Sequence, residues 1–307
     1  MGPTAAGKTG LAVDLAQRLP LEIISVDSAM VYQGMDIGTA KPSPALLRIA
    51  PHHLIDICDP TEVYSAARFR DDAMYCIREI HARGRTPLLV GGTGLYFRAL
   101  EQGLSELPTG DAETRKHLEA EAKEVGWEAM HARLAQVDPE AAGKIHPHDP
   151  QRIQRALEVY QLTGRPITAH FRELSKQRLL CRVVKILIIP SDRGYLHRQA
   201  EQRFLRMLEN GLVDEVRRLF ARGDLHAGLP AMRLVGYRQI WNHLEGGLSH
   251  KEMTDKAVIA TRQLIKRQLT WLRKEQGGHG FDSLDAGLRD KILKFLEDRL
   301  KTGQFVI

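Results

Sequence analysis

The chain has 307 residues, of which 43% are hydrophobic and 27% are charged, as in a globular protein with one or two domains. It contains no run of about 18 apolar residues, so we expect no membrane-spanning segment and no membrane partner. The cysteines Cys58, Cys76 and Cys181 are too scattered for a metal site or a disulfide framework and indicate a reducing, cytoplasmic location.

The net charge of +6 is unevenly distributed along the chain. Residues 1–107 carry 10 Lys and Arg against 12 Asp and Glu, and residues 108–182 carry 12 against 11. Residues 183–307 carry 22 against 15, which places the basic excess in the last segment. This excess favours a nucleic-acid partner, although a solvated basic helix surface would have the same composition.

The chain opens with a match to the phosphate-binding pattern G-x-x-x-x-G-K-[ST], and a helix with leucines four residues apart follows. We predict that the loop binds a diphosphate or triphosphate, that Lys8 reaches the outer phosphates and that the Thr9 hydroxyl binds Mg²⁺. The alternative is a glycine-rich turn that arose by chance. The loop residues are Gly2, Pro3, Thr4, Ala5, Ala6, Gly7, Lys8 and Thr9.

Such a loop normally follows a buried central strand, and only Met1 precedes it in this sequence. Without that strand, neighbouring backbone groups would lose partners at a cost of about 1–3 kcal/mol each. We therefore expect the natural protein to begin upstream of Met1 with about five to ten further residues, several of them apolar.

Apolar runs at residues 21–26, 86–90 and 183–189 predict three buried strands, and helical patterns lie between and after them. This alternation predicts an α/β fold with a parallel sheet, in which ligands bind at the carboxyl ends of the strands. The predicted helices span residues 66–83, 111–125, 127–136, 150–163, 195–210, 213–222, 238–244 and 254–274.

The sequence predicts an all-helical insertion at residues 107–181, because no strand pattern occurs there. Residues 1–106 and 182–307 would then form the catalytic core, without the strand that leads into the phosphate loop. The second part of this core is mostly helical, and the last thirty residues contain no motif that indicates a function.

Two polar side chains follow predicted strands at the edge that carries the phosphate loop. Asp27 is the only strand-end carboxylate there, so a role as general base toward an acceptor is favoured over metal-dependent hydrolysis, and the alternative is a turn cap. Thr93 lies in a Gly-Gly-Thr-Gly turn, where it could donate to a phosphate or a base or could simply form a tight turn.

The predicted helix at residues 254–274 has an apolar stripe of Ile265, Leu269 and Leu272, which indicates one face in a core. Basic residues on the remaining surface could contact a phosphate backbone. Trp271 could stack on a base or anchor the core. The basic residues are Arg262, Lys266, Arg267, Arg273 and Lys274.

These residues, together with several further motifs in the same order, resemble the tRNA dimethylallyltransferases, also called tRNA isopentenyltransferases (the IPP transferase family), in their bacterial form. The resemblance runs from residue 2 to about 273. The motifs are DSAMVYQGMDIGTAKP at 27–42, PHHLID at 51–56, YSA at 64–66, VGGTGLY at 90–96, DPQR at 149–152, RALEV at 155–159, VGYRQ at 235–239, TRQL at 261–264 and KRQLTWLR at 266–273.

The resemblance implies a P-loop NTPase-like parallel sheet flanked by helices and a prenyl transfer reaction. A dimethylallyl group would pass from dimethylallyl diphosphate to N6 of the adenosine that follows the tRNA anticodon, with release of pyrophosphate. The phosphate loop and Mg²⁺ would then hold a leaving group, and no ATP would be consumed. A monomer that binds the anticodon stem-loop, with the helical insertion against the anticodon arm, is the expected form.

The resemblance also assigns roles to individual residues. Asp27 corresponds to the base that accepts the N6 proton, Thr93 to a contact with the flipped adenine or substrate, and Arg203 to a second cation on the diphosphate. The implied tRNA contacts are Asp27, Ser28, Ala29, Met30, Thr93, Arg115, Gln151, Arg152, Ile153, Gln154, Arg155, Arg233, Leu234, Val235, Gly236, Tyr237, Arg238, Lys266, Arg267, Gln268, Leu269, Thr270, Trp271, Leu272 and Arg273.

Two other functions remain open from the residues alone. A nucleoside or small-molecule kinase of the same fold would also use Lys8 and Mg²⁺, but the sequence shows no arginine cluster typical of an ATP lid. A non-catalytic RNA-binding module could keep the loop as a scaffold, but Lys8, Thr9 and Asp27 are all present.

Overall fold

The computed structural model describes residues 1–105, 107–172, 183–300 and 305–306, and the chain divides into two units. One unit comprises Met1–Leu100 with Leu180–Ile307, and the other comprises Glu101–Leu179. The predicted domain boundaries at residue 106 and at residues 181 and 182, as well as Cys181, lie outside the described residues. None of the described helices is long and apolar enough to cross a membrane.

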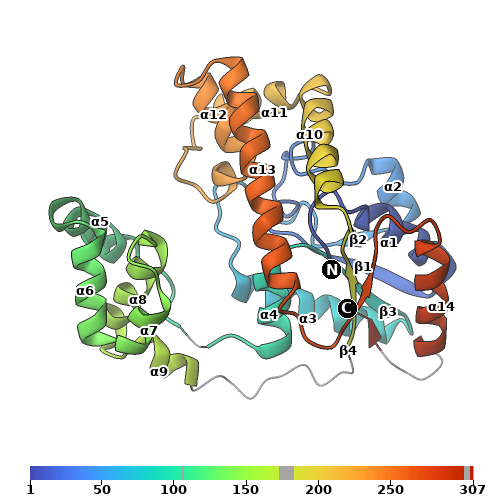
Figure 1. Ribbon diagram of the computed structural model, residues 1–307, viewed down its shortest axis with the longest axis horizontal. Helices are drawn as coiled ribbons and strands as arrows, with labels where there is room; N and C mark the ends of the chain where they lie inside the picture. The colour runs from blue at the N-terminus through green and yellow to red at the C-terminus, as the bar shows by residue number, and fades with distance from the viewer. Residues whose placement is uncertain (106, 173–182, 301–304, 307) are drawn as a thin grey trace. The chain divides into compact units, whose positions relative to one another are not determined.

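The larger unit is built on a parallel sheet with the strand order β2-β1-β3-β6-β4-β5 (Figure 1). β1 and β3 pair along their whole length, so their carboxyl ends lie side by side. Asp27 and Gly92 therefore leave the sheet at the same edge. The strands are β1 Leu21–Val26, β2 His52–His53, β3 Thr86–Gly91, β4 Val183–Ile188, β5 Gly278–Phe281 and β6 Phe305–Val306.

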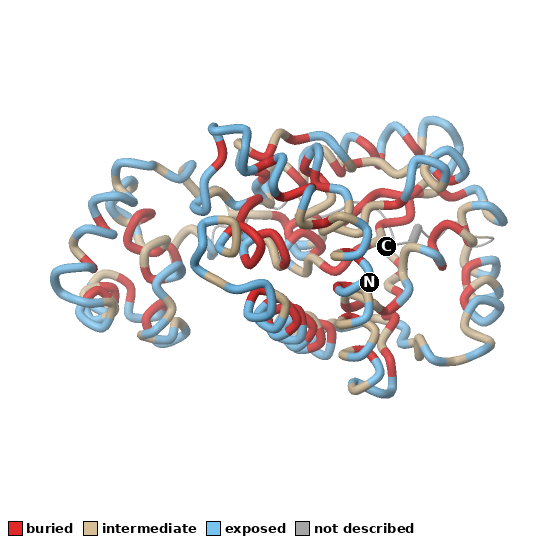
Figure 2. Tube along the Cα trace, turned by 90° about the horizontal axis from the view of Figure 1, so that it is seen from above, coloured by how far each residue is buried: buried red, intermediate tan, exposed pale blue. Residues whose placement is uncertain are grey.

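The sheet is flanked by helices whose apolar sides pack on it, as predicted for this α/β fold. Figure 2 shows helices with one buried side and one exposed side, which is the pattern of an amphipathic helix. The helices of this unit are α1 Lys8–Arg18, α2 Pro44–Ile49, α3 Ala66–Ala82, α10 Arg193–Glu209, α11 Leu212–Phe220, α12 Tyr237–Leu244, α13 His250–Leu272, α14 Leu288–Leu300 and the short 3₁₀ helix η1 Ala231–Arg233, and α4 Gly94–Gln102 spans the boundary between the units.

The three predicted strands are confirmed as β1, β3 and β4, because their apolar runs are buried on both faces. The predicted stripe of Ile265, Leu269 and Leu272 on α13 is also buried. That helix starts four residues earlier than predicted, because Ser249 and Glu252 form a capping box at its N-terminus.

Several elements were not predicted, because their sequences carry weak signals. β2 has two residues, β5 reads Gly-His-Gly-Phe, and α14 lies in the tail that showed no motif. β6 lies between β3 and β4, and its backbone pairs with Leu88, Val183 and Val184. The expected strand upstream of Met1 remains a prediction.

The second unit is entirely helical in its described part and has its own apolar core. Leu118, Leu134, Ile153 and Val159 are fully buried in that core. Asp and Pro residues at the breaks cap and start the helices. The helices are α5 Ala112–Val125, α6 Trp127–Val137, α7 Pro139–Lys144, α8 Pro150–Thr163 and α9 Ile167–Arg172.

The close pairing of β1 and β3 leads to a stability prediction at Gly91. A Cβ atom at this position would lie 1.9 Å from the Val26 carbonyl oxygen, so Gly91→Ala should lower the free energy of unfolding by about 3 kcal/mol. Gly10→Ala is the control, because a Cβ there meets no atom within 4 Å and a helical Ala should stabilise by about 0.5–1 kcal/mol. Unchanged urea unfolding of Gly91→Ala would contradict this packing.

Candidate active site

The phosphate loop runs along the carboxyl edge of the sheet. The Ile188 amide of β4 donates to the Met1 carbonyl at 2.8 Å, and the Gly2 amide donates to the Gly91 carbonyl of β3 at 3.3 Å. Gly7 has a φ of +76°, in the left-handed region, and α1 begins at the next residue. The loop therefore delivers its backbone to the positive end of a helix dipole, which is an anion-binding arrangement.

A cavity of about 360 Å³ lies over this loop, entirely within the larger unit. Loop residues Thr4–Thr9 form one side, and Asp27 lies on the end of β1. Arg203 and Arg206 of α10 supply positive charge from a third direction. The structure thus brings together the loop, the predicted base and the predicted second cation, although these lie up to about 200 residues apart in the sequence.

The two predicted cations are both destabilised by desolvation in this cavity. The Lys8 ammonium donates to the Pro3 carbonyl at 2.6 Å, and burial lowers its pKa to about 8, with Asp27 opposing and Arg203 adding to the shift. Arg203 donates to the Thr4 hydroxyl at 2.5 Å, and burial also lowers the pKa of its guanidinium. An anion between these groups would restore the stability of both charges.

Asp27 caps the turn that follows β1 and also lines the cavity. Its Oδ1 accepts a hydrogen bond from the Ala29 amide at 2.8 Å, as the turn-cap alternative requires, and the residue lines the cavity. A carboxylate held in this way is oriented before any substrate arrives. Thr93 supports the same turn, because its Oγ1 accepts from the Ser28 amide at 3.1 Å.

Sequence reasoning missed several polar residues that line the cavity, namely Ser25, Thr39, His52, Gln199, Arg206 and Gln268. Two of these residues lie on the same face of α10 as the predicted Arg203, because Gln199 precedes it by four residues and Arg206 follows it by three. Helical periodicity from Arg203 could therefore have found Gln199 and Arg206. Gln268 was predicted as a tRNA contact, and nothing in its sequence surroundings indicated a contact with the phosphate loop.

Gln268 links α13 to both parts of the site. Its Oε1 accepts from the Thr4 amide at 2.8 Å, and its Nε2 donates to the Gly92 carbonyl at 3.1 Å. One turn further on, Trp271 packs so closely that a Cβ at Gly94 would lie 2.6 Å from its ring. The inner side of α13 therefore holds the loop and the Gly92–Gly94 turn, and Trp271 anchors this packing.

Exposure separates the predicted tRNA contacts of the larger unit into groups. The buried members, which offer little surface to a partner, are Leu269, Leu272, Gly236 and Tyr237. Ser28, Ala29, Met30, Thr93, Leu234, Val235, Gln268 and Trp271 are partly exposed. The exposed members are Arg233, Arg238, Lys266, Arg267, Thr270 and Arg273.

The predicted contacts of the helical unit cluster around a buried carboxylate. Glu158 accepts from Arg115 Nε at 2.8 Å and from Arg155 Nη1 at 2.6 Å, and the Gln154 amide donates to the Arg115 carbonyl. Ile153 is fully buried, so its predicted tRNA contact does not fit its position in the core. Gln151 and Arg152 are exposed at the start of α8.

The donor set fits a magnesium ion that is held jointly with a phosphate ligand. Among the described residues there is no group of three or more His, Cys, Asp or Glu side chains that could hold a metal. Thr9 and Asp27 nevertheless line the same cavity, and Mg²⁺ characteristically combines one or two protein oxygens with substrate phosphates and water.

Comparisons with known proteins agree on one family. A sequence profile described as IPP transferase matches residues 30–275. A protein named tRNA dimethylallyltransferase from Alkalilimnicola ehrlichii is 57% identical over 96% of this chain and 94% of its own length. A relative of the same name from Thioalkalivibrio sulfidiphilus is 60% identical over 90% of this chain and 87% of its own length.

Solved structures of similar proteins share the fold along nearly the whole chain. The full-length tRNA isopentenylpyrophosphate transferase of Bacillus halodurans is 39% identical, with a TM-score of 0.71 over 98% of this chain and 95% of that one. A eukaryotic dimethylallyltransferase solved in snapshots acting on tRNA is 26% identical, with a TM-score of 0.81 over 99% of this chain and 78% of that one.

The lowered pKa of Lys8 predicts proton uptake when an anion binds. At pH 9 a group with a pKa of about 8 is mostly neutral, and a bound anion favours its charged form. Calorimetric titration with pyrophosphate in two buffers of different ionisation enthalpy should show about one more proton taken up by the wild type than by Lys8→Met. At pH 7 the two should agree, and equal uptake at pH 9 would exclude this role of Lys8.

Proposed function

The chain belongs to the IPP transferase family, and we propose from this premise that it transfers a dimethylallyl group from dimethylallyl diphosphate to tRNA. The acceptor is N6 of the adenosine that directly follows the anticodon, and the second product is pyrophosphate. The observation that carries the proposal is the cavity in which Lys8, Arg203 and the loop backbone face Asp27, the one carboxylate among the described residues that line it.

The loop acts on the leaving group. Backbone amides at the start of α1, Lys8 and Arg203 surround the position of a diphosphate and stabilise the charge that grows as the carbon–oxygen bond breaks. Arg206 adds a further cation at the same cavity. The Thr9 hydroxyl would hold Mg²⁺ beside the diphosphate, and the ion, when bound, supplies additional neutralisation of the leaving oxygen.

Asp27 acts on the nucleophile. The N6 amine forms a bond to C1 of the dimethylallyl group while the bond from C1 to the diphosphate oxygen breaks. The amine then carries one proton too many, and Asp27 accepts it. The Ala29 amide bonds to Oδ1 of this carboxylate, and Asp27 lines the cavity, so Oδ2 is the oxygen assigned to accept the proton.

The acceptor base must leave its stack to reach a buried cavity, and the cost of unstacking has to be recovered by contacts with the RNA. The exposed cations Arg233, Arg238, Lys266 and Arg273 belong to the segment with the net charge of +7 and suit contact with the anticodon stem-loop. We assign the protein to the cytoplasm, as a monomer, with the helical unit against the anticodon arm.

Replacing the base should slow chemistry without weakening RNA binding. Asp27→Asn keeps an oxygen that can accept from the Ala29 amide but cannot take the N6 proton, so single-turnover transfer should fall about 10²–10⁴-fold. The control is Asp71→Asn, an exposed carboxylate on α3 that should transfer at the wild-type rate. Near-normal single-turnover rates in Asp27→Asn would remove Asp27 from this role.

Lys266 and Arg267 are exposed cations of α13, and Arg273 directly follows that helix. Neutralising these three residues should weaken tRNA binding and make it less salt-dependent. In the triple change Lys266→Gln, Arg267→Gln and Arg273→Gln, the salt slope should fall by about one unit for each RNA phosphate that is no longer neutralised. The matched control changes three cations of α14, Arg289, Lys291 and Lys294, in the same way. An unchanged slope in the α13 variant would show that this helix does not bind the RNA.

A further inference from the structure

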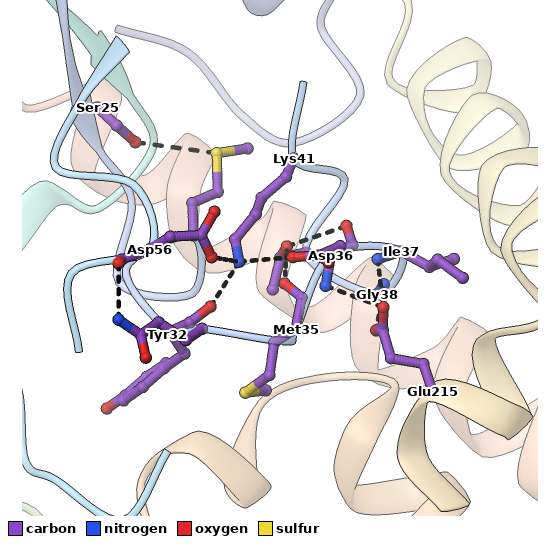
Figure 3. A network of polar contacts seen from close by, with 12 residues as sticks. Ser25, Tyr32, Met35, Asp36, Ile37, Gly38, Lys41, Asp56 and Glu215 are labelled. Atoms are coloured by element: carbon purple, nitrogen blue, oxygen red, sulfur yellow. Dashed lines mark hydrogen bonds and ion pairs between the residues drawn. The ribbon is translucent and has the colours of Figure 1, made fainter. Parts of the chain in front are cut away.

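A buried carboxylate outside the cavity grips the loop that forms one of its walls. Glu215 of α11 is 2% exposed. Its Oε2 accepts from the Asp36 and Ile37 amides at 2.9 and 2.8 Å, and its Oε1 accepts from the Gly38 amide at 3.2 Å (Figure 3). A buried carboxylate is costly unless its lone pairs are used, so these three successive amides fix the conformation of the loop.

The same carboxylate is joined to α12. The Tyr237 hydroxyl donates to Glu215 Oε1 at 2.5 Å, and burial beside that carboxylate raises the pKa of Tyr237, which keeps the hydroxyl a donor. The ring also packs directly on the loop, because a Cβ at Gly38 would lie 2.5 Å from Tyr237 Cε2. The loop and the start of α12 therefore meet through a hydrogen bond and a van der Waals contact.

The contact between Tyr237 and the loop joins two segments, and each is proposed to lie beside a different substrate of the reaction. On one side, Thr39, Ala40 and Pro42 continue the gripped loop and line the cavity of the phosphate loop. On the other side, Arg233 and Arg238 are exposed close to Tyr237 in the segment proposed to contact tRNA.

A second set of contacts holds the loop between Gly38 and the residues that line the cavity. The Lys41 ammonium bonds to the Tyr32 carbonyl and to the carboxylates of Asp36 and Asp56 (Figure 3). Thr39 donates its hydroxyl to the Met35 carbonyl at 2.6 Å. The segment from Asp36 to Lys41 is therefore held by hydrogen bonds at both of its ends.

We propose that Glu215 is a positioning residue that, through Tyr237, couples RNA binding at residues 233–238 to the shape of the diphosphate cavity. This inference rests on the proposed function. RNA that holds the start of α12 in place also holds the Glu215 carboxylate and hence the cavity wall, so each ligand favours the arrangement that the other requires. Reciprocal tightening of the two ligands is the consequence.

The test measures binding of inorganic pyrophosphate with and without a saturating unmodified anticodon stem-loop. In the wild type the RNA should tighten pyrophosphate binding about 5-fold or more. Tyr237→Phe keeps the ring and removes only the hydroxyl, and Glu215→Gln turns an amide N–H toward backbone N–H groups. Both should bring the effect of the RNA below about 2-fold. The control is Asp214→Asn, an exposed neighbour on α11 that bonds to Arg217 and should keep the full effect.

Full coupling in Tyr237→Phe, or no coupling in the wild type, would overturn the proposal. If Glu215→Gln fails to fold, Tyr237→Phe with a wild-type melting temperature decides alone. In turnover, the Tyr237→Phe variant should raise the donor KM with kcat little changed, whereas simple loss of folded protein would lower kcat alone. The binding experiment needs no turnover, so failure of the wild type to prenylate tRNA would reveal an error in the proposed function separately.

Discussion

The site depends on a surplus of positive charge that is removed from water before any ligand arrives. Lys8 and Arg203 both have pKa values lowered by burial, and the Asp27 carboxylate opposes both shifts. Such an arrangement is unfavourable by itself and becomes favourable when a multiply charged anion enters. In the proposed reaction the cavity gives up folding stability to create affinity for a diphosphate, and the same field would then act on the departing pyrophosphate.

The fold offsets this loss by holding the cations from several directions. The sheet aligns the carboxyl ends of β1 and β3, which sets Asp27 beside the phosphate loop. Gln268 of α13 bonds to the loop at Thr4 and to the turn at Gly92, and Arg203 of α10 bonds to the same Thr4. Two helices from the second half of the chain thus complete a site that begins at the first residues, and a tRNA-modifying enzyme gains a rigid centre.

Both units also contain a buried glutamate that organises polar groups in or beside a segment proposed to contact RNA. Glu158 gathers Arg115 and Arg155 in the helical unit, and Glu215 gathers Tyr237 and the loop amides in the larger unit. Each carboxylate is fully satisfied by its donors, so the surrounding segments have one preferred arrangement. This order is present without RNA.

Much of the fold could be predicted because its signals are local. Apolar runs of strand length and helical patterns predicted the main elements, and the spacing of the phosphate loop predicted the anion-binding end of α1. The contacts of Gln268 and Glu215 could not be predicted in the same way. Each joins residues more than 170 positions apart, and a polar residue on an amphipathic helix has the same pattern whether it meets solvent or a buried amide.

The measurement that tests the central claim most directly follows two labels in one assay. The purified protein is mixed with Mg²⁺ and unmodified tRNA, and receives either dimethylallyl diphosphate labelled in its prenyl group or ATP labelled at its γ-phosphate. We predict that prenyl label enters the adenosine next to the anticodon, with one pyrophosphate released per transfer and no requirement for ATP. Transfer of the γ-phosphate label to an acceptor, without prenyl incorporation, would contradict the account and indicate a kinase.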